Sequence, residues 1–596
     1  MRKLLTTVIV LFTTFCVSVD AQTSNKNNLL GNNSGDPDRE NIFVHHNASL
    51  FFTGEYLYYK VYAINSTKRT LSRLSKIVYV ELIGEDEKNV FNHKIALINS
   101  QGQGDFFIPN SVPSGNYKLV AYTQRMRNIG TANFFQADIS IINPYRGNQS
   151  SLMNTEMDEG AVSEINISEN SLPVVQTKLD DYSEFKLLFA ERKFKKRTKV
   201  ELSLKNFIRE RGFGYYSLSI RKIDAIPSFP RDNSVNFEAK LRIDANKFKT
   251  GSVKYPSESK GSIISGKVFE KKANALAKGQ NVALSISGKN FFFKVLTTNS
   301  RGEFSFSLDP HWDRETSTIQ VVSDARENYR IELNNADLID YSGISFNSFR
   351  ITPSMETAIV ERSIYNQIEN AYFSIKPDTV KMVSPEKPFI YYEKKLRYNL
   401  DDYTRFETME EVFREIVKLV WTAKDANGND TIKVFKNEFS TPTEDPPLLF
   451  IDGVFVQDPK DFLAYDARKV LGVTVVRNQY QFGTQDYQGV VLIETISGEY
   501  ENQQSGDFVT DLALFKPEQK KNYYQQKYEE TNDLASSRIP DYRSQLLWEP
   551  SIDLSANEIN FKFYTSDNLG DYEISLEGFT KDGKPVSLRE VITVEE

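Results

Sequence analysis

The apolar stretches of this sequence are almost all of strand length, and turn-forming residues separate them. Residues 57–62, 77–82 and 119–122 show the pattern: they are rich in valine, leucine, isoleucine and tyrosine, and polar or turn-forming residues lie between them. Runs of about four to eight such residues predict β-strands. Because the pattern extends over most of the 596 residues, we expect a mainly β, multidomain chain of tandem sandwiches.

One segment departs from this pattern. At its centre, residues 448–456, an apolar run reaches Asp452-Gly453 and then resumes. Asp-Gly between apolar runs predicts a tight hairpin, because glycine accepts the positive φ that such a turn requires. Asp458 and Pro459 follow as a helix N-cap and first helical residue. Strands and helices are therefore predicted to alternate here.

Two buried strands are predicted after this helix. Residues 473–476 form the first, and residues 490–493 form the second, after a loop bracketed by Gly483 and Gly489. We expect a small α/β unit over residues 396–500. Its sequence offers no nucleophile, general base or metal-ligand cluster, so it indicates an architecture and not a reaction.

The N-terminus has the features of a secretory signal. Arg2 and Lys3 precede an apolar run over 4–19, and a site of small residues ends at Ala21. This is typical of a signal peptide, here residues 1–21, so we expect an exported protein that is periplasmic or associated with the outer membrane. A single membrane anchor is the alternative. The run is short, however, and no other apolar stretch reaches about 18 residues, so we expect no transmembrane span.

The single cysteine, Cys16, lies inside this signal. A lipoprotein signal places a small residue before the modified cysteine, whereas Phe15 precedes this one. Cleavage after Ala21 therefore leaves a mature chain without cysteine. Disulfides, thiol catalysis and thiolate metal sites are then excluded together.

Composition and strand spacing divide the chain into segments. The expected order is a signal peptide (1–21), a flexible leader (22–40), an immunoglobulin-type sandwich (41–145), a linker (146–180), a second sandwich-like domain (181–258), a third β domain (259–340), a helical connector (341–395), the α/β unit (396–500), and a connecting segment with a C-terminal β element (501–596).

Two of the β segments resemble known domains. Gly54-Glu55 and the strand that follows, together with residues 108–128 (IPNSVPSGNYKLVAYTQRMRN), resemble the MG2-type macroglobulin domain. Residues 264–306 resemble the carboxypeptidase regulatory-like domain, a transthyretin-like sandwich without a catalytic role. A generic sandwich is the alternative for each segment, and both alternatives leave an all-β spacer.

The α/β unit resembles the plug domain of TonB-dependent outer-membrane receptors. The matching features are residues 406–412, 416–420, the LLFIDGV motif at 448–454 and GVVLIET at 489–495. In the receptors, the plug precedes a barrel of about 22 strands, each of about 9–11 residues. About a hundred residues follow Thr495, so we expect no barrel in this chain. The alternative is another small α/β domain with a tight hairpin.

The order of these pieces resembles a group of exported Gram-negative envelope proteins that lack a barrel. The macroglobulin resemblance on its own implies a thioester protease trap, in which a cysteine is acylated by a nearby glutamine. A mature chain without cysteine excludes that mechanism.

The four histidines do not predict a metal site. A zinc site needs three or four suitably spaced ligands. His45 and His46 point to opposite sides if they lie on a strand, and His93 and His311 are distant in sequence. We expect structural or solvated histidines, with metal ligation as the alternative.

The sequence also contains three acidic motifs and one basic run. Residues 425–430 superficially resemble a calcium loop, but the twelfth position is Lys436 instead of glutamate, so a hairpin turn is expected. Glu410-Glu411 lies near the start of a predicted helix, where negative charge favours the helix dipole, and the pair Asp401-Asp402 has no visible acid–base partner. The basic run at 193–199 predicts a solvated turn before a strand, with contact to anionic lipopolysaccharide or lipid headgroups as the alternative.

These observations favour a non-enzymatic interaction or scaffold protein of the envelope, with an outer-membrane barrel among its partners. The alternative is an accessory protein that binds a glycan or peptide for uptake. An exposed aromatic platform, such as Tyr215-Tyr216 or Tyr523-Tyr524, would favour that alternative. We expect no catalytic, cofactor-binding or metal-binding residues. The net charge of −7 argues against a nucleic-acid partner.

Overall fold

The computed structural model describes residues 38–153, 184–244, 254–288, 290–308, 312, 314–335, 337–381, 395–437, 443–482, 484–500, 505–528 and 539–596. With 47% of its residues in strands and 13% in helices, the chain is a mainly β, multidomain protein, as predicted. The predicted signal peptide, with Cys16, lies outside the described residues, as do most of the leader and most of the predicted linker.

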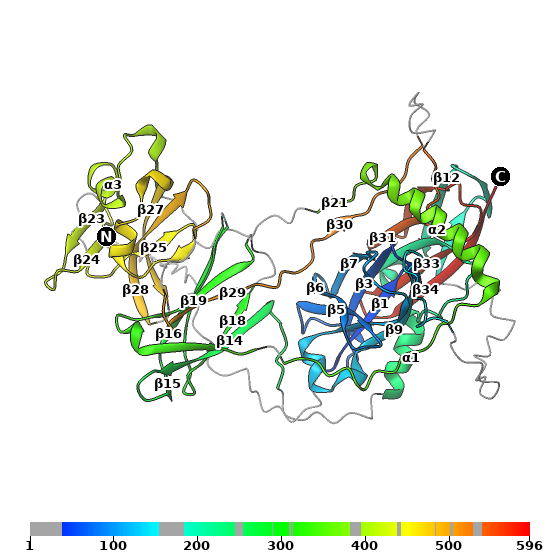
Figure 1. Cartoon of the computed structure of the whole chain (residues 1–596), viewed down its shortest axis with the longest axis horizontal. Coiled ribbons are helices and arrows are strands. Elements are labelled where there is room, and N and C mark those ends of the chain that lie inside the picture. The colour runs from blue at the N-terminus through cyan, green and yellow to red at the C-terminus, as the bar shows by residue number, and fades with distance from the viewer. Residues whose placement is uncertain are drawn as a thin grey trace, which may run out of the picture.

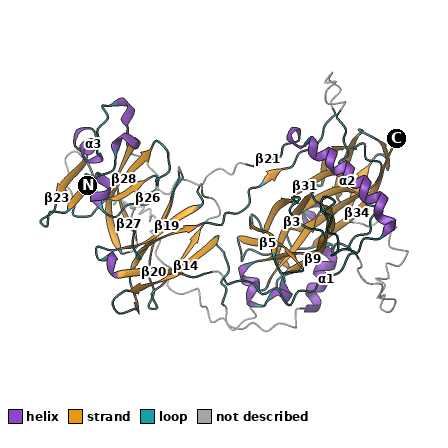
Figure 2. Ribbon diagram, viewed as in Figure 1, coloured by secondary structure: helices purple, strands orange, loops and turns teal. Residues whose placement is uncertain are grey.

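The described residues form two lobes joined by extended segments (Figure 1). The sandwich lobe holds the strands of residues 40–142, 185–222 and 545–595, with helices α1 (Ser234–Asp244) and α2 (Glu356–Ala371). The α/β lobe holds the strands of residues 262–333, 395–495 and 509–513. Strands make up the body of both lobes, and α2 lies along the outside of the sandwich lobe (Figure 2). Two short paired strands, β21 (Thr379–Val380) and β30 (Lys521–Asn522), lie on the segments between the lobes.

The first sandwich is made of two antiparallel-rich sheets whose inner faces share a large apolar core. One sheet contains β1 (Glu40–His46), β3 (Tyr56–Asn65), β4 (Thr70–Leu71) and β7 (Gln101–Phe107). The other contains β2 (Leu50–Phe52), β9 (Phe135–Ile142), β8 (Gly115–Tyr122), β5 (Ile77–Gly84) and β6 (Asn89–Ala96).

The second sandwich draws its strands from both ends of the chain. One sheet is β10 (Phe185–Phe189), β12 (Lys199–Asn206) and β32 (Glu558–Tyr564). The other is β11 (Lys193–Lys195), β34 (Pro585–Glu595), β33 (Gly570–Thr580), β13 (Gly214–Lys222) and β31 (Gln545–Leu554).

This arrangement corrects the predicted boundaries of 181–258 and 501–596. Strands β10–β13 alone leave their apolar faces uncovered, and the C-terminal strands supply the missing partners. Leu218 and Leu576 are cross-strand partners and both are fully buried. The two sandwiches also pack on each other, with Phe579 in ring contact with Phe43 and Tyr62 at centroid distances of 5.8 and 5.5 Å.

The third β unit likewise takes a strand from outside its predicted range of 259–340. One sheet contains β15 (Ala275–Leu276), β14 (Ser262–Glu270), β18 (Glu303–Leu308) and β20 (Tyr329–Leu333). The other contains β17 (Phe292–Thr297), β16 (Asn281–Ile286), β19 (Thr316–Val322) and β29 (Val509–Ala513).

The predicted Asp452-Gly453 hairpin is confirmed. Asp452 and Gly453 have φ of 47° and 85°, and they connect β25 (Leu448–Ile451) to β26 (Val454–Phe455). The Asp452 carboxylate accepts hydrogen bonds from the backbone N–H groups of Thr495 and Tyr500 at 2.8 and 3.0 Å, so it also fixes the end of the last strand of the unit.

The remaining elements of the α/β unit complete one five-stranded sheet, a hairpin and two helices. They are β22 (Lys395–Asn399), β27 (Val470–Phe482) and β28 (Gln485–Thr495) in the sheet, the hairpin β23 (Val420–Lys424) and β24 (Asp430–Val434), and helices α3 (Met409–Glu415) and α4 (Pro459–Leu463). Asp458 caps α4 and Pro459 opens it, as predicted.

The predicted loop between Gly483 and Gly489 is shorter than expected. Strand β28 begins at Gln485 and runs through Gly489, which has a φ of 87° inside the strand. A Cβ at Gly489 would lie 2.6 Å from Cγ1 of Val434, so glycine is needed there for close packing and not for a loop. Gly483 lies outside the described residues.

Both faces of the sheet of the α/β unit are covered by the same chain. On one face, Val475 and Val491 pack with the helix residues Val412 and Phe462. On the other, Phe450 and Phe455 pack against Phe293 of the third β unit, at centroid distances of 4.9 and 5.1 Å. The α/β unit and the third β unit therefore share a core.

A buried ionic network ties the sandwich lobe together. Glu55, in the turn between β2 and β3, accepts two hydrogen bonds from Arg362 of α2, at 2.9 and 2.7 Å. Arg221 of β13 donates to the same carboxylate at 3.1 Å, and Arg362 also pairs with Asp224. Burial opposes the ionisation of Glu55, but the two guanidinium groups hold the pKa of Glu55 below its ordinary value.

Replacing Glu55 with glutamine tests the network. The variant leaves two buried guanidinium groups without their shared carboxylate, so we expect the free energy of unfolding of the sandwich lobe to fall by about 3–5 kcal/mol. Urea denaturation followed by tryptophan fluorescence measures the loss. Asp86→Asn, which breaks an exposed pair with Lys88, should leave the urea midpoint unchanged. Equal midpoints for Glu55→Gln and the wild type would contradict a stabilising role.

A second buried carboxylate predicts a dependence of stability on pH. Glu258 accepts a hydrogen bond from the Tyr79 hydroxyl at 3.1 Å, and burial raises the pKa of Glu258 from 4.5 to about 7. The folded state therefore binds more protons than the unfolded state between these values, so the free energy of unfolding falls as pH rises from about 4.5 to about 7.

Replacing Glu258 with glutamine removes this dependence. We expect wild type and variant to unfold at similar urea concentrations near pH 5, whereas at pH 8 the variant should be more stable, by an amount on the order of 3 kcal/mol. Urea midpoints at the two pH values measure the difference. The same difference at both pH values would show that Glu258 does not titrate on unfolding.

Candidate interaction surface

The three described histidines belong to the first sandwich, and each contacts a polar group there or, for His45, on β13 of the second sandwich. Nδ1 of His45 lies 2.7 Å from the Ser217 hydroxyl, and Nδ1 of His46 lies 2.7 Å from the carbonyl of Ala48. Nδ1 of His93 lies 2.7 Å from the Tyr59 hydroxyl, and burial lowers the pKa of His93 to about 4. His311 lies outside the described residues, within which no group of three or more His, Cys, Asp or Glu side chains is arranged to hold a metal.

The acidic motifs occupy the local positions expected from the sequence. Asp425 accepts hydrogen bonds from the backbone of Asn427 and Asn429 at 2.8 Å each, in the turn between β23 and β24, which confirms the predicted hairpin. Glu411 forms a capping box with Thr408 at the start of α3. Asp401 lies in the short 3-10 helix of residues 400–402.

The basic run forms β11, a turn and the first residue of β12. Arg197 has a φ of 56° in the turn and pairs with Asp567. Lys193 and Lys196 pair with Glu595 and Glu596 at 3.5 and 3.4 Å. The C-terminal carboxylates thus partly neutralise this run. Lys199, at its end, lies apart from them.

The two tyrosine pairs have different environments. Tyr216 is fully buried, with its hydroxyl donating to the carbonyl of Gly212 at 2.8 Å, and half-buried Tyr215 packs on the first core. That pair is therefore not an exposed platform. Tyr523 packs edge-on against Tyr58, with ring centroids 4.9 Å apart, and Tyr524 is 37% exposed.

Tyr523 belongs to a chain of aromatic contacts that reaches the surface. We call Tyr56, Tyr58, Phe107, Phe373 and Tyr523 the aromatic ridge. Tyr56 stacks on Tyr58 at 5.5 Å and on Phe373 at 5.8 Å, and it contacts Phe107 at 5.1 Å. Phe107 and Phe373 are 41% and 45% exposed. Phe373 lies two residues beyond the end of α2, at the start of a short 3-10 helix.

Helix α2 exposes a stripe of apolar side chains on its outer side. Val360 and Ile364, one turn apart, are 52% and 50% exposed. Within the predicted helical connector, the sequence predicts a helix over residues 356–372 with Ile359, Ile364, Ile368 and Tyr372 roughly on one side. However, the five residues from 359 to 364 correspond to a rotation of about 140°. Ile359 consequently packs on the core of Leu50 and Phe52, whereas Ile364 faces away from it.

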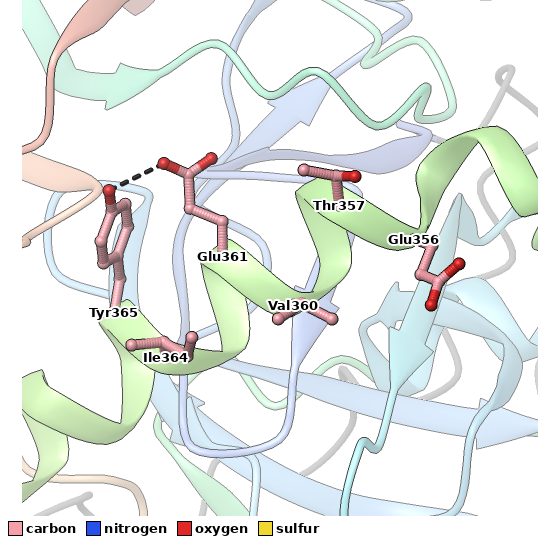
Figure 3. A pocket seen from close by; sticks show the side chains of 6 residues that line it. All are labelled: Glu356, Thr357, Val360, Glu361, Ile364 and Tyr365. Atoms are coloured by element: carbon pink, nitrogen blue, oxygen red, sulfur yellow. Dashed lines mark hydrogen bonds between the residues drawn. The ribbon is translucent and has the colours of Figure 1, made fainter.

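A groove with a volume of about 480 Å³ follows this stripe (Figure 3). Its lining residues are Glu356, Thr357, Val360, Glu361, Ile364 and Tyr365. The Tyr365 hydroxyl donates to Glu361 at 2.7 Å and orients that carboxylate. The groove is therefore apolar along its middle and acidic at its sides.

Polar contacts hold the opposite side of α2 on the first sandwich. Besides the Arg362 network, Asn366 donates to the carbonyl of Thr53 at 2.7 Å. The ring of Tyr365 stacks on Tyr542 at 4.3 Å. Gly54 permits the close approach, since a Cβ there would lie 2.4 Å from Nδ2 of Asn370. The attached side of this part of the helix therefore combines these polar contacts with the apolar packing of Ile359, while Val360 and Ile364 remain exposed.

No helix among the described residues has the length and apolar character needed to cross a membrane.

No protein-family model matches the chain, and no curated protein sequence does so either. Among solved structures, a Salmonella alpha-2-macroglobulin reacted with methylamine is 10% identical and covers 95% of this chain, with a TM-score of 0.22. An Escherichia coli alpha-2-macroglobulin activated by porcine elastase is 9% identical and covers 93%, with a TM-score of 0.23. The chain spans 40% and 44% of these two proteins.

A third structure, the Yersinia pseudotuberculosis adhesin InvE, is 8% identical with a TM-score of 0.13, and the match covers 49% of this chain and 57% of the adhesin. TM-scores this low do not establish a shared fold, so none of these likenesses carries a function to this chain.

Proposed function

We propose that this protein is a non-enzymatic interaction and scaffold protein of the cell envelope that works in an outer-membrane assembly with a barrel protein as its neighbour. The observation that carries the proposal is the apolar stripe of α2. Val360 and Ile364 face outward on a helix whose other side is fixed by the buried Arg362–Glu55 pair. A rigid helix with an exposed apolar face is a common protein-docking element.

The chemistry of the groove indicates what kind of segment it receives. Glu356 and Glu361 flank the apolar centre, and no lysine or arginine is among its lining residues. A partner segment with apolar side chains between lysines or arginines would complement both features. Phe373 and Phe107, which are exposed on the aromatic ridge, offer further aromatic area, and aromatic side chains are enriched at protein interfaces.

The proposed docking does not require the α/β unit to enter a barrel. Its sheet is packed against α3 and α4 on one face and against the third β unit on the other. Entry into a pore by the α/β unit alone would expose Phe450 and Phe455. The unit and its sandwich are therefore expected to act as one body beside the partner.

Replacing the stripe with charge tests this function. The tagged protein is purified from native envelopes in a gentle detergent, and the proteins that accompany it are identified. We expect a stoichiometric outer-membrane barrel protein with the wild type, and its loss with Val360→Asp/Ile364→Asp, because two carboxylates would be desolvated against acidic neighbours.

The matched control is Leu276→Asp/Leu338→Asp, which adds the same charge at exposed positions away from α2. It should retain the partner, and both variants should keep the wild-type thermal unfolding midpoint. Recovery of the wild-type protein alone and soluble in the periplasmic fraction would overturn the assembly proposal. If both variants lost the partner equally, the docking site would not lie on α2.

A further inference from the structure

A second groove lies at the outer edge of the second sandwich, where residues 525–527 pass beside β32. Its volume is about 490 Å³, within the range of small-molecule binding pockets. Strand β32 is the outer strand of its three-stranded sheet. Edge strands present backbone N–H and C=O groups to a ligand. The groove shares no lining residue with the α2 groove.

Three lysines from three distant parts of the chain meet there. Lys199 begins β12, Lys562 lies on β32, and Lys527 comes from the segment that crosses them. Glu201 pairs with Lys199 at 3.1 Å and with Lys562 at 3.7 Å, but all three side chains are at least 45% exposed. Exposed pairs of this kind are weak, so the ammonium groups remain available to an anion. One carboxylate against three ammonium groups leaves the groove basic.

Amide side chains and apolar rings complete the lining. Asn560 and Lys562 alternate on β32 and therefore share its outer face. Gln525 and Gln526 line the opposite wall. Amides both donate and accept hydrogen bonds, as the hydroxyl groups of sugars require.

The apolar part of the groove is small and rigid. Leu547 and Phe561 line it and pack on the core of the second sandwich. Tyr564, also on β32, is held edge-on by Tyr528 at a centroid distance of 5.6 Å. Aromatic rings fixed in this way offer a face for stacking. The apolar area is too limited for a lipid chain and suits the faces of sugar rings.

We propose that this groove binds an anionic oligosaccharide, with carboxylate or sulfate groups contacting Lys199, Lys527 and Lys562, and with sugar hydroxyls contacting the amide side chains. From the sequence, the basic run at 193–199 predicted a solvated turn before a strand, with contact to an anionic surface as the alternative. The structure joins only its last lysine to this groove, because Lys193 and Lys196 pair with the C-terminal carboxylates. The site is independent of docking through α2.

Isothermal titration calorimetry on the full mature chain tests the proposal. The probes are a hexasaccharide of galacturonic acid, a heparin-derived hexasaccharide and neutral maltohexaose. We expect saturable binding of at least one anionic probe and much weaker binding of the neutral one. Lys527→Gln/Lys562→Gln should raise the Kd for that probe about tenfold or more, and added salt should raise it as well.

The matched control is Lys193→Gln/Lys196→Gln, which removes the same charge from the neighbouring turn and should change the Kd by less than about twofold. Equal weakening of binding in both double variants would show non-specific electrostatic attraction and overturn the proposed site. So would equal binding of maltohexaose, or no binding of either anionic probe. Binding to vesicles with anionic lipids but to neither anionic oligosaccharide would also overturn it, and would indicate a membrane surface instead.

Discussion

The buried pairing of Glu55 with Arg362 and Arg221 is the constraint on which the sandwich lobe depends. Taking four charges out of water is costly, and only close geometry offsets that cost. Here two carboxylates meet two guanidinium groups, and Arg362 also donates to the carbonyl of Leu50 at 2.9 Å, so the charges balance and the donors are used. The four side chains come from the β2–β3 turn, from β13 and the residues after it, and from α2. If any one of these parts shifted, a buried charge would lose its partner.

The exposed surface of α2 follows from this constraint. The helix is attached by arginine, asparagine and a stacked tyrosine as well as by Ile359, which packs on the core. Val360 and Ile364 are not needed for this attachment and remain exposed. The attachment is specific in direction, because hydrogen bonds and ion pairs fix the rotation of the helix about its axis. Apolar packing alone would fix that rotation less strictly.

Local features of this fold could be predicted from the sequence, whereas long-range pairing could not. The Asp452-Gly453 turn, the Asp458-Pro459 helix start and the position of Glu411 near a helix start depend on neighbours within a few positions, and the structure confirms each. Glu55 and Arg362 are 307 positions apart, and nothing in either local pattern indicates the other. The same holds for β13 and β33. Each shows the alternation of polar and apolar residues typical of a strand, but neither sequence indicates the register in which the two strands pair. The α2 stripe was only partly predicted: Ile364 was identified and Val360 was not, and Ile359 was grouped with Ile364 although the two lie on different faces of the helix. The meeting of the three lysines in the edge groove could not be predicted from the sequence, because only the folded path of the chain brings them together.

The chain leaves the second sandwich after β13 and returns to it only with β31. The α/β lobe is therefore inserted between the two halves of a domain that it does not belong to. Because synthesis proceeds from the N-terminus, β10–β13 are made before the strands β31–β34 that complete their sheets, whereas the strands of the inserted lobe precede β31. Pairing of the C-terminal strands with β13 also brings Phe579 against Phe43 of the first sandwich. A chain that lacks β31–β34 therefore cannot form the second sandwich or the aromatic contacts that join it to the first.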